Sequence, residues 1–132
     1  MKILKEFKEI KGDASFRKFY RNKKRNSIII FTKKEKQKNL LVYDAINKIL
    51  NKNKILAPKL LSQRYQKNYI EIQDLGDETI FQKLNKKKIN KYLIMKRVIR
   101  ILNKIQLIKD KKIKNFLNQL YTIKYYDESK LF

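Results

Sequence analysis

The sequence predicts an α+β fold in which a strand-rich part is followed by a helical part. Before residue 77, runs rich in β-branched and aromatic residues indicate strands. One stretch between these runs carries apolar residues at the three-and-four spacing of an amphipathic helix. After Asp77, glycine and proline are absent and helical spacing takes over. Strands and helices separated in this way along a chain are typical of the α+β class.

The first thirty residues are predicted to contain a short helix and a β-hairpin. Residues 2–10 have apolar side chains at helical spacing, and Gly12 and Asp13 end this helix. Residues 14–31 favour strands on both sides of a polar turn at 22–26. The second of these strands, 27–31, is continuously apolar after Ser27.

A longer helix and a second hairpin follow. Residues 36–51 place apolar side chains on one helical face and polar side chains on the other. The short runs 59–64 and 68–73 are separated by three residues, which suits a hairpin. The Asp-Leu-Gly-Asp segment 74–77 then forms a turn or linker.

The rest of the chain is predicted to be helical. Residues 80–84 suit a short helix, residues 89–108 suit a helix of about five turns with one buried face, and residues 116–120 suit another turn or two. We therefore expect two parts, 1–76 and 77–132.

Composition excludes many kinds of site. The 132 residues suffice for one compact domain. Cysteine and histidine are both absent, which excludes disulfides, the usual zinc sites and nucleophiles activated by imidazole. No apolar run approaches the roughly 20 residues that span a bilayer, and the N-terminus lacks the pattern of a secretory signal. We expect a cytoplasmic protein with no membrane partner.

The formal charge of +23 has two interpretations. Clustered cations bind nucleic acid by releasing counterions from its phosphates. However, lysine far outnumbers arginine, and lysine, isoleucine and asparagine are all residues of A/T-rich codons. Compositional drift would therefore spread lysines over the chain without creating a binding face. A small module that binds RNA or another polyanion stays open as an alternative, with aromatic residues such as Tyr20, Tyr65, Tyr69 and Phe19 available to stack on bases.

Two short motifs are candidates for a ligand site. Residues 12–17, Gly-Asp-Ala-Ser-Phe-Arg, lie just before a strand, where a turn of small residues lets backbone amides approach a phosphate. A plain structural turn is the alternative. Residues 74–77 lie between the two parts and suit a hinge, or a capped turn in which Asp77 is the N-cap of the next helix.

The order and spacing of these motifs resemble one protein family. The segment 12–21, the Asp-Leu-Gly-Asp segment 74–77, the Tyr-Asp-Glu segment 126–128 and the terminal Leu131 and Phe132 are similar to the bacterial anomeric kinases for N-acetylmuramate and N-acetylglucosamine. These enzymes belong to the aminoglycoside phosphotransferase superfamily. The chain resembles only the N-terminal portion of such an enzyme.

The resemblance implies a protein-kinase-like fold, in which a small nucleotide-binding lobe, 1–76, clamps ATP against a helical lobe whose first, incomplete part is 77–132. It also implies a nucleotide site made of a loop over the triphosphate, a lysine near the third strand and a hinge beside adenine. The nucleotide-binding residues are then Gly12, Asp13, Ala14, Ser15, Phe16, Lys33, Gln73, Asp74 and Leu75. Arg17 is expected to be a strand-surface or inter-lobe residue.

The sequence departs from the kinase pattern near the third strand. Kinases place a lysine on that strand and pair it with a glutamate of the following helix. Here the strand lacks lysine, and Lys33 or Lys34, just past its end, is either the substitute or a solvated surface lysine. The following helix has Asp44 and no central glutamate.

No catalytic or metal-binding residue is expected in this chain. In the family, the His-x-Asp-x-x-x-x-Asn loop and a metal-binding aspartate come after the Tyr-Asp-Glu element. The resemblance therefore implies an N-terminal fragment that is inactive alone. In the complete enzyme, ATP with Mg²⁺ would phosphorylate the anomeric hydroxyl of an amino sugar in peptidoglycan recycling.

Overall fold

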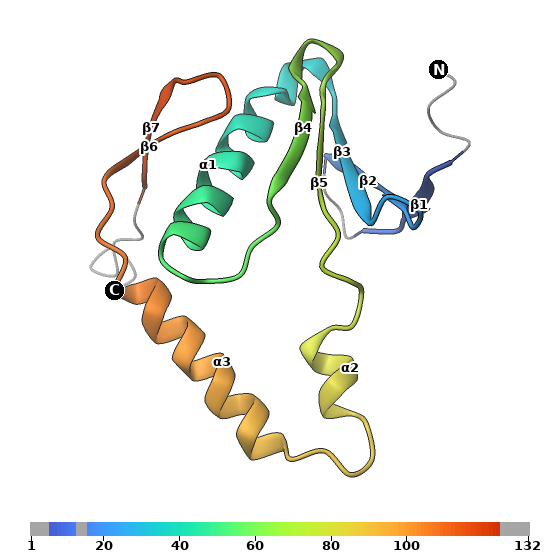
Figure 1. Cartoon of the computed structure of the whole chain (residues 1–132), viewed down its shortest axis with the longest axis vertical. Helices are drawn as coiled ribbons and strands as arrows, with labels where there is room; N and C mark the ends of the chain where they lie inside the picture. Colours follow the sequence, from blue (N-terminus) through green and yellow to red (C-terminus); the bar gives the residue numbers. More distant parts are fainter. Residues whose placement is uncertain (1–5, 13–15, 125–132) are drawn as a thin grey trace.

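The computed structural model describes residues 6–12 and 16–124, and its largest element is a five-stranded antiparallel sheet (Figure 1). The strand order is β1-β2-β3-β5-β4. The strands are β1 (Lys8–Ile10), β2 (Arg17–Asn22), β3 (Ser27–Thr32), β4 (Leu60–Arg64) and β5 (Tyr69–Gln73). The α+β class and both predicted hairpins are confirmed.

The predicted helix over residues 2–10 is wrong for the residues that the structure describes. Lys8, Glu9 and Ile10 form β1 and pair with Arg21, Tyr20 and Phe19 of β2. A three-residue strand has no strong local signal. The ladder with β2 therefore outweighs the helical spacing of the apolar residues.

The β2–β3 turn is specified by two asparagines. The Asn22 Oδ1 atom accepts a hydrogen bond from the Arg25 N–H at 3.2 Å. Asn26 adopts a φ of 52°, a left-handed conformation that asparagine tolerates better than most residues. The turn thus brings Arg17 opposite Thr32 at the far end of the hairpin.

Helix α1 (Lys38–Lys52) packs on one face of the sheet and confirms the helix predicted at 36–51. Strand alternation places Ile30 and Phe19 on this face, and β5 contributes Ile70 and Ile72. These side chains form the main core with Leu40 of α1.

The opposite face of the sheet contains a buried carboxylate. Glu71 accepts hydrogen bonds from the hydroxyl groups of Ser27 at 2.6 Å and Ser62 at 3.1 Å. The Arg25 guanidinium lies 3.9 Å away. Because a buried charge is costly without partners, this arrangement specifies how β3, β4 and β5 align.

The chain beyond the sheet contains two helices, α2 (Ile80–Leu84) and α3 (Lys91–Gln106), followed by a hairpin of β6 (Lys112–Lys114) and β7 (Leu120–Thr122). The N-cap of α2 is Thr79, which forms a capping box with Gln82, so the alternative that Asp77 is the cap is wrong.

The predicted helical turn at 116–120 is also wrong, because this segment forms the turn of the β6–β7 hairpin. The Asn115 Oδ1 atom accepts hydrogen bonds from the N–H groups of Leu117 and Gln119. Asn118 has a φ of 57°. Side-chain bonding of this kind to nearby backbone groups favours a turn over a helix.

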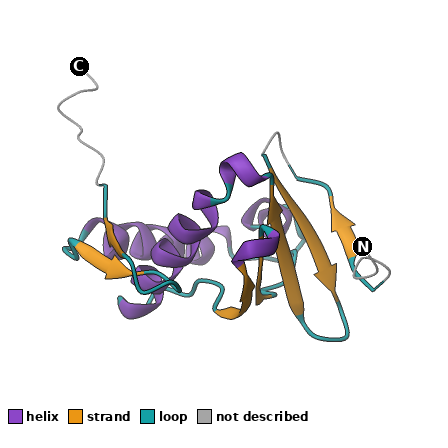
Figure 2. Cartoon of the chain, turned by 90° about the horizontal axis from the view of Figure 1, so that it is seen from above, coloured by secondary structure: helices purple, strands orange, loops and turns teal. Residues whose placement is uncertain are grey.

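Residues near the β6–β7 hairpin pack against α1. A second hydrophobic cluster joins Ile49 and Ile55 to Ile108, with Ile113 and Ile123 packed against it. Phe116 meets Tyr65 edge to face, with ring centroids 5.8 Å apart. Figure 2 shows this hairpin at the opposite end of the molecule from the five-stranded sheet.

Helix α3 confirms the predicted helix at 89–108 but not its buried face. None of its residues is buried, and Ile99 is 54% exposed. In Figure 1 the helix runs below α1 and away from the sheet. No helix in the described part of the chain combines the length and apolarity needed to cross a membrane.

An isoleucine-to-alanine substitution should lower the free energy of unfolding much more in the main core than on the exposed surface of α3. Ile30→Ala removes a fully buried side chain, so we expect a loss of about 2–5 kcal/mol in the free energy of unfolding. Ile99→Ala on α3 should change it by about 0.5 kcal/mol or less. Urea unfolding followed by circular dichroism measures both, and equal losses would contradict this assignment of the core.

Candidate functional site

The predicted phosphate loop is only partly within the described residues. Gly12 and Phe16 flank the segment Asp13, Ala14 and Ser15, which lies outside the described residues, as does the Tyr-Asp-Glu segment 126–128. A Cβ atom built on Gly12 would stand 3.9 Å from Cδ2 of Phe19. Gly12 therefore lies against the side of β2 that faces α1.

The strand that follows the predicted loop begins at the end of the sheet opposite to the predicted hinge. Arg17, which follows the loop, pairs with Thr32, whereas Gln73 pairs with Ser27 at the other end of β3. The Asp74 N–H donates to the Asn26 carbonyl at 3.0 Å. A six-residue strand rises roughly 3.3 Å per residue, so about 17 Å separates the two ends.

A half-buried apolar strip lies between the two ends. Ile10 pairs with Phe19, and Arg21 pairs with Ile28. Phe19 and Ile28 pack against the main core and remain partly exposed. Of the hollows lined by described residues, two lie beside Arg21, and one of these two is also lined by Ile10 and Asp77; another lies on α3, and another lies between α1 and β4. The sheet therefore brings the two predicted stretches to one face but not into one of these hollows.

Arg21 ties the second strand to the predicted hinge. Its Nε atom donates to Asp74 Oδ2 at 2.6 Å, and its Nη2 atom donates to Asp74 Oδ1 at 3.2 Å. Its Nη1 atom donates to Asp77 Oδ2 at 3.0 Å. Asp74 Oδ1 also accepts from the Gly76 N–H at 2.8 Å. This bidentate pair links residues 53 positions apart in the chain.

These bonds change the acidity of both groups. Burial acts to raise the pKa of Asp74, but the Gly76 amide and the Arg21 guanidinium outweigh burial and hold that pKa below its usual value. The hydrogen bond with Asp74 is the largest influence on Arg21 and raises the pKa of its guanidinium. Both groups are therefore ionised at neutral pH.

Most backbone donors of the predicted hinge are already engaged. The Gln73 N–H donates to the Lys59 carbonyl at 2.9 Å, and the Asp74 N–H donates to Asn26. Among the described residues, the Leu75 N–H has no hydrogen-bond partner, and Leu75 is exposed. Of the three hinge residues, Leu75 is thus the one with a backbone donor available to a ligand.

The predicted lysine and the helix carboxylate are not brought together. Lys33 is exposed just before a 3-10 turn at Lys34–Lys36. Asp44 is buried on α1, and its Oδ2 atom lies 2.9 Å from the Nζ atom of Lys48 on the same helix. The carboxylate of this helix is therefore paired within the helix.

Arg17 is the first residue of β2 and is half-buried among aromatic rings. Its guanidinium carbon lies 5.5 Å from the ring centroids of Phe16 and Tyr43 and 6.0 Å from that of Phe19. The Nζ atom of Lys36 lies 5.8 Å from the Phe16 centroid. Arg17 and Phe19 are two residues apart on one strand, so strand alternation alone places them on the same face.

Comparison with models of protein families, with curated proteins and with solved structures found no match for this chain. Within the described ranges, no group of three or more acidic side chains is arranged to hold a metal ion. The candidate site therefore rests on the geometry of the sheet and on the two motifs at its ends.

The Arg21–Asp74 pair should make stability depend on acidic pH. Because folding lowers the pKa of Asp74, its contribution is present above the unfolded pKa of about 4 and is lost as pH falls through the folded value. We expect Asp74→Asn to cost about 1–3 kcal/mol at pH 7. The difference from wild type should shrink steadily below about pH 4 in urea unfolding experiments. A difference that does not change with pH would exclude this role for the pair.

Replacing each of the two glycines with alanine should lower the free energy of unfolding by different amounts. Gly76 has a φ of +92°, which an L side chain adopts only with strain, so Gly76→Ala should cost about 1–2 kcal/mol. Gly12 has no such φ and meets only an ordinary contact, so Gly12→Ala should cost about 0.5 kcal/mol or less. Thermal unfolding of the two variants tests this, and a larger cost at Gly12 would show that our account of the two turns is wrong.

Proposed function

We propose that this chain is the nucleotide-holding part of an ATP-dependent phosphotransferase that acts on a sugar or amino-sugar hydroxyl. One observation carries the proposal. The sheet has Arg17 and Lys36 beside the Phe16 ring at one end, the half-buried Phe19 and Ile28 in its middle, and just past its other end the Leu75 N–H, which has no hydrogen-bond partner among the described residues. A nucleoside triphosphate laid along the strands would have its phosphates at the cations and its sugar and base on the apolar residues. The hydrogen-bonding edge of the base would then lie at the hinge amide.

The dimensions and chemistry of the face support nucleotide binding. The length of β2, about 17 Å, is comparable to that of an extended nucleoside triphosphate. Ile10, Phe19 and Ile28 offer apolar surface to a flat base. At the hinge, the Leu75 N–H is a donor for the base, and the Arg21–Asp74 pair holds the hinge against β2.

A kinase-like lobe is consistent with the order of elements. Strands β1 to β3 precede α1, strands β4 and β5 follow it, and two helices come after the hinge. Phosphoryl transfer in such enzymes depends on positioning and on neutralising the charge of the phosphates. The chain contains no histidine, and the described residues include no carboxylate cluster for Mg²⁺, so a base and metal ligands would have to come from outside them.

The acceptor follows from the resemblance of the two motifs and not from the geometry. An anomeric hydroxyl of an amino sugar is the acceptor that the resemblance implies. One fold can support the phosphorylation of many different acceptors. A different acceptor hydroxyl would therefore leave the nucleotide-binding part of the proposal unchanged.

Nucleotide binding without turnover is the expected behaviour of the 132-residue chain. Isothermal titration calorimetry with Mg²⁺-ATP should show saturable binding. A coupled assay with ATP and N-acetylglucosamine or N-acetylmuramate should show no rate above background. Absence of ATP binding would refute the nucleotide site, whereas measurable turnover would refute the assignment of the chain as inactive alone.

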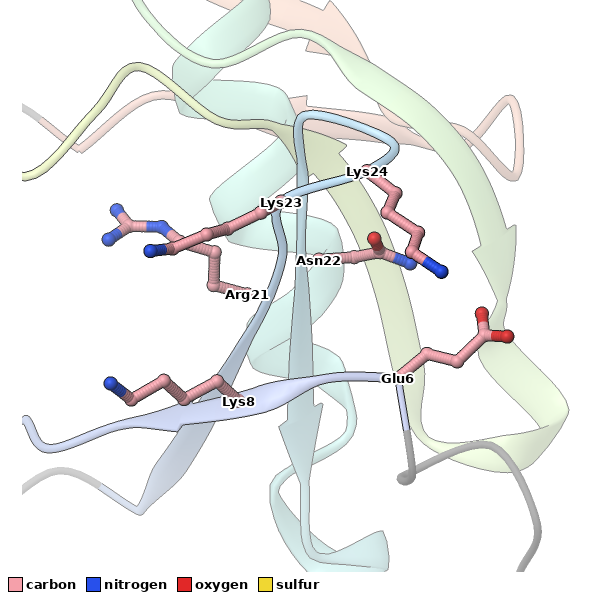
Figure 3. Close-up of a pocket in the computed structure, with 6 residues that line it drawn as sticks. All are labelled: Glu6, Lys8, Arg21, Asn22, Lys23 and Lys24. Carbon is pink, nitrogen blue, oxygen red and sulfur yellow. The ribbon is translucent and has the colours of Figure 1, made fainter.

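A polyanion-binding module is the second candidate, because cations surround a hollow of about 430 Å³ beside β1 and β2. Figure 3 shows Lys8, Arg21 and Lys23 extending to one side of the strand, and Lys24 to the other side with Glu6. The side chains thus diverge, and Arg21 is already paired with Asp74. A gel shift with single-stranded RNA that weakens steeply with salt, without ATP binding, would favour this candidate.

A further inference from the structure

We propose that α3 is a docking surface for a helix of another protein, and that this partner helix has an apolar seam bordered by acidic side chains. The docking surface consists of Tyr92, Met95, Ile99 and Leu102, which we call the outer seam. The inference goes beyond the proposed function and does not depend on nucleotide binding.

The spacing of the outer seam is the first support. Its residues follow one another at intervals of three, four and three positions, which places them in one row along the helix. All four side chains are exposed, and Tyr92 is 74% exposed. Rows with this three-and-four spacing are the ones that pack against a second helix in coiled coils. An exposed row of this kind is therefore suited to contact with the side of another helix.

A hollow in the outer seam is the second support. It has a volume of about 340 Å³ and is lined by Tyr92, Met95, Lys96, Ile99 and Arg100. The first four of these residues stand at positions i, i+3, i+4 and i+7 of α3. Four neighbouring residues at such positions form the hole that receives one side chain of a facing helix. Because a lipid surface has no side chain to place in such a hole, the shape favours a helix as the partner.

The charge around the outer seam is the third support, because it selects the chemistry of the partner. Lys96 and Arg100 line the hollow itself. Residues 79–109 include ten lysine and arginine residues and no aspartate or glutamate. Helices that pack along an apolar seam commonly pair opposite charges beside it. A helix with glutamate or aspartate next to its apolar residues is therefore the complementary partner.

The same charge argues against pairing between two copies of this chain. Helix α3 alone has five cations and no carboxylate, and the cations are Lys91, Lys96, Arg97, Arg100 and Lys104. Two such helices packed side by side would bring like charges together, which disfavours association. One pair of short helices buries less surface than a standard interface, so we expect binding of the acidic partner to be reversible and in the micromolar range.

Two synthetic peptides serve as probes for the full 132-residue chain. Each peptide has three heptads with leucine at the two apolar positions, and the flanking positions are glutamate in one peptide and lysine in the other. Fluorescence anisotropy at low salt should show that the glutamate peptide binds about tenfold more tightly than the lysine peptide, or better. Added salt should reduce this difference, because it screens the charges beside the seam.

Two variants with matched exposure locate the apolar contact. Met95, in the outer seam, and Leu93, on a different side of the same helix, are both 44% exposed. Met95→Gln should weaken binding of the glutamate peptide about tenfold, because an apolar contact is lost. Leu93→Gln should change the affinity by less than about twofold. Ile99→Gln provides a second seam variant, and circular dichroism checks that each variant keeps its helices.

Two variants with matched charge test the acidic flank of the partner. Lys96→Glu and Arg97→Glu change the net charge equally, but only Lys96 lines the hollow. Lys96→Glu should weaken the glutamate peptide about tenfold and strengthen the lysine peptide. Arg97→Glu should change both affinities by less than about threefold, because the next residue is turned about 100° around the helix, away from the seam.

The opposing outcomes are distinct. Equal affinity for the two peptides, or equal weakening by Met95→Gln and Leu93→Gln, would overturn the inference. Sedimentation of the chain with vesicles of phosphatidylcholine and phosphatidylglycerol, without peptide binding, would assign the seam to a membrane and would also overturn it. A dimer that Met95→Gln dissociates would assign the seam to a second copy, with the same result. Absence of ATP binding would refute the proposed function and leave this inference intact.

Discussion

The pairing of β3 with two antiparallel neighbours is the constraint on which the rest of the structure depends. Its register with β2 and β5 decides which side chains face α1 and which face the buried carboxylate of Glu71. A slip of one residue would move Ile30 out of the core and bring Ser27 into it. Ser27 and Ser62 oppose such a slip, because in this register both hydroxyls donate to the buried Glu71 carboxylate.

That register also creates the candidate site. It puts Arg17 and Arg21 on the same face of β2, one at each end, with Phe19 between them. The two arginines have different partners. Arg21 is bound to the carboxylates of Asp74 and Asp77, which suits a structural link, and the guanidinium of Arg17 lies beside the rings of Phe16 and Tyr43.

The two long helices illustrate how similar patterns reach different environments. Helix α1 buries Leu40, Ala45 and Ile49 between the sheet and the residues around the β6–β7 hairpin. Helix α3 has the stronger apolar stripe but buries no residue within the described part of the chain. On the proposed function, this stripe belongs to the interior of a helical lobe, where further helices would cover it.

Local sequence determined the hairpins and the long helices, because turn residues such as Asn26 and the spacing of apolar side chains act over a few residues. It also located the loop and hinge motifs. Tertiary structure alone decided that residues 8–10 form a strand and that Asp74 binds Arg21. It likewise decided the rings around Arg17. Each of these depends on contacts between distant segments or on competition between local and long-range bonds, and periodicity along the chain contains no information about either.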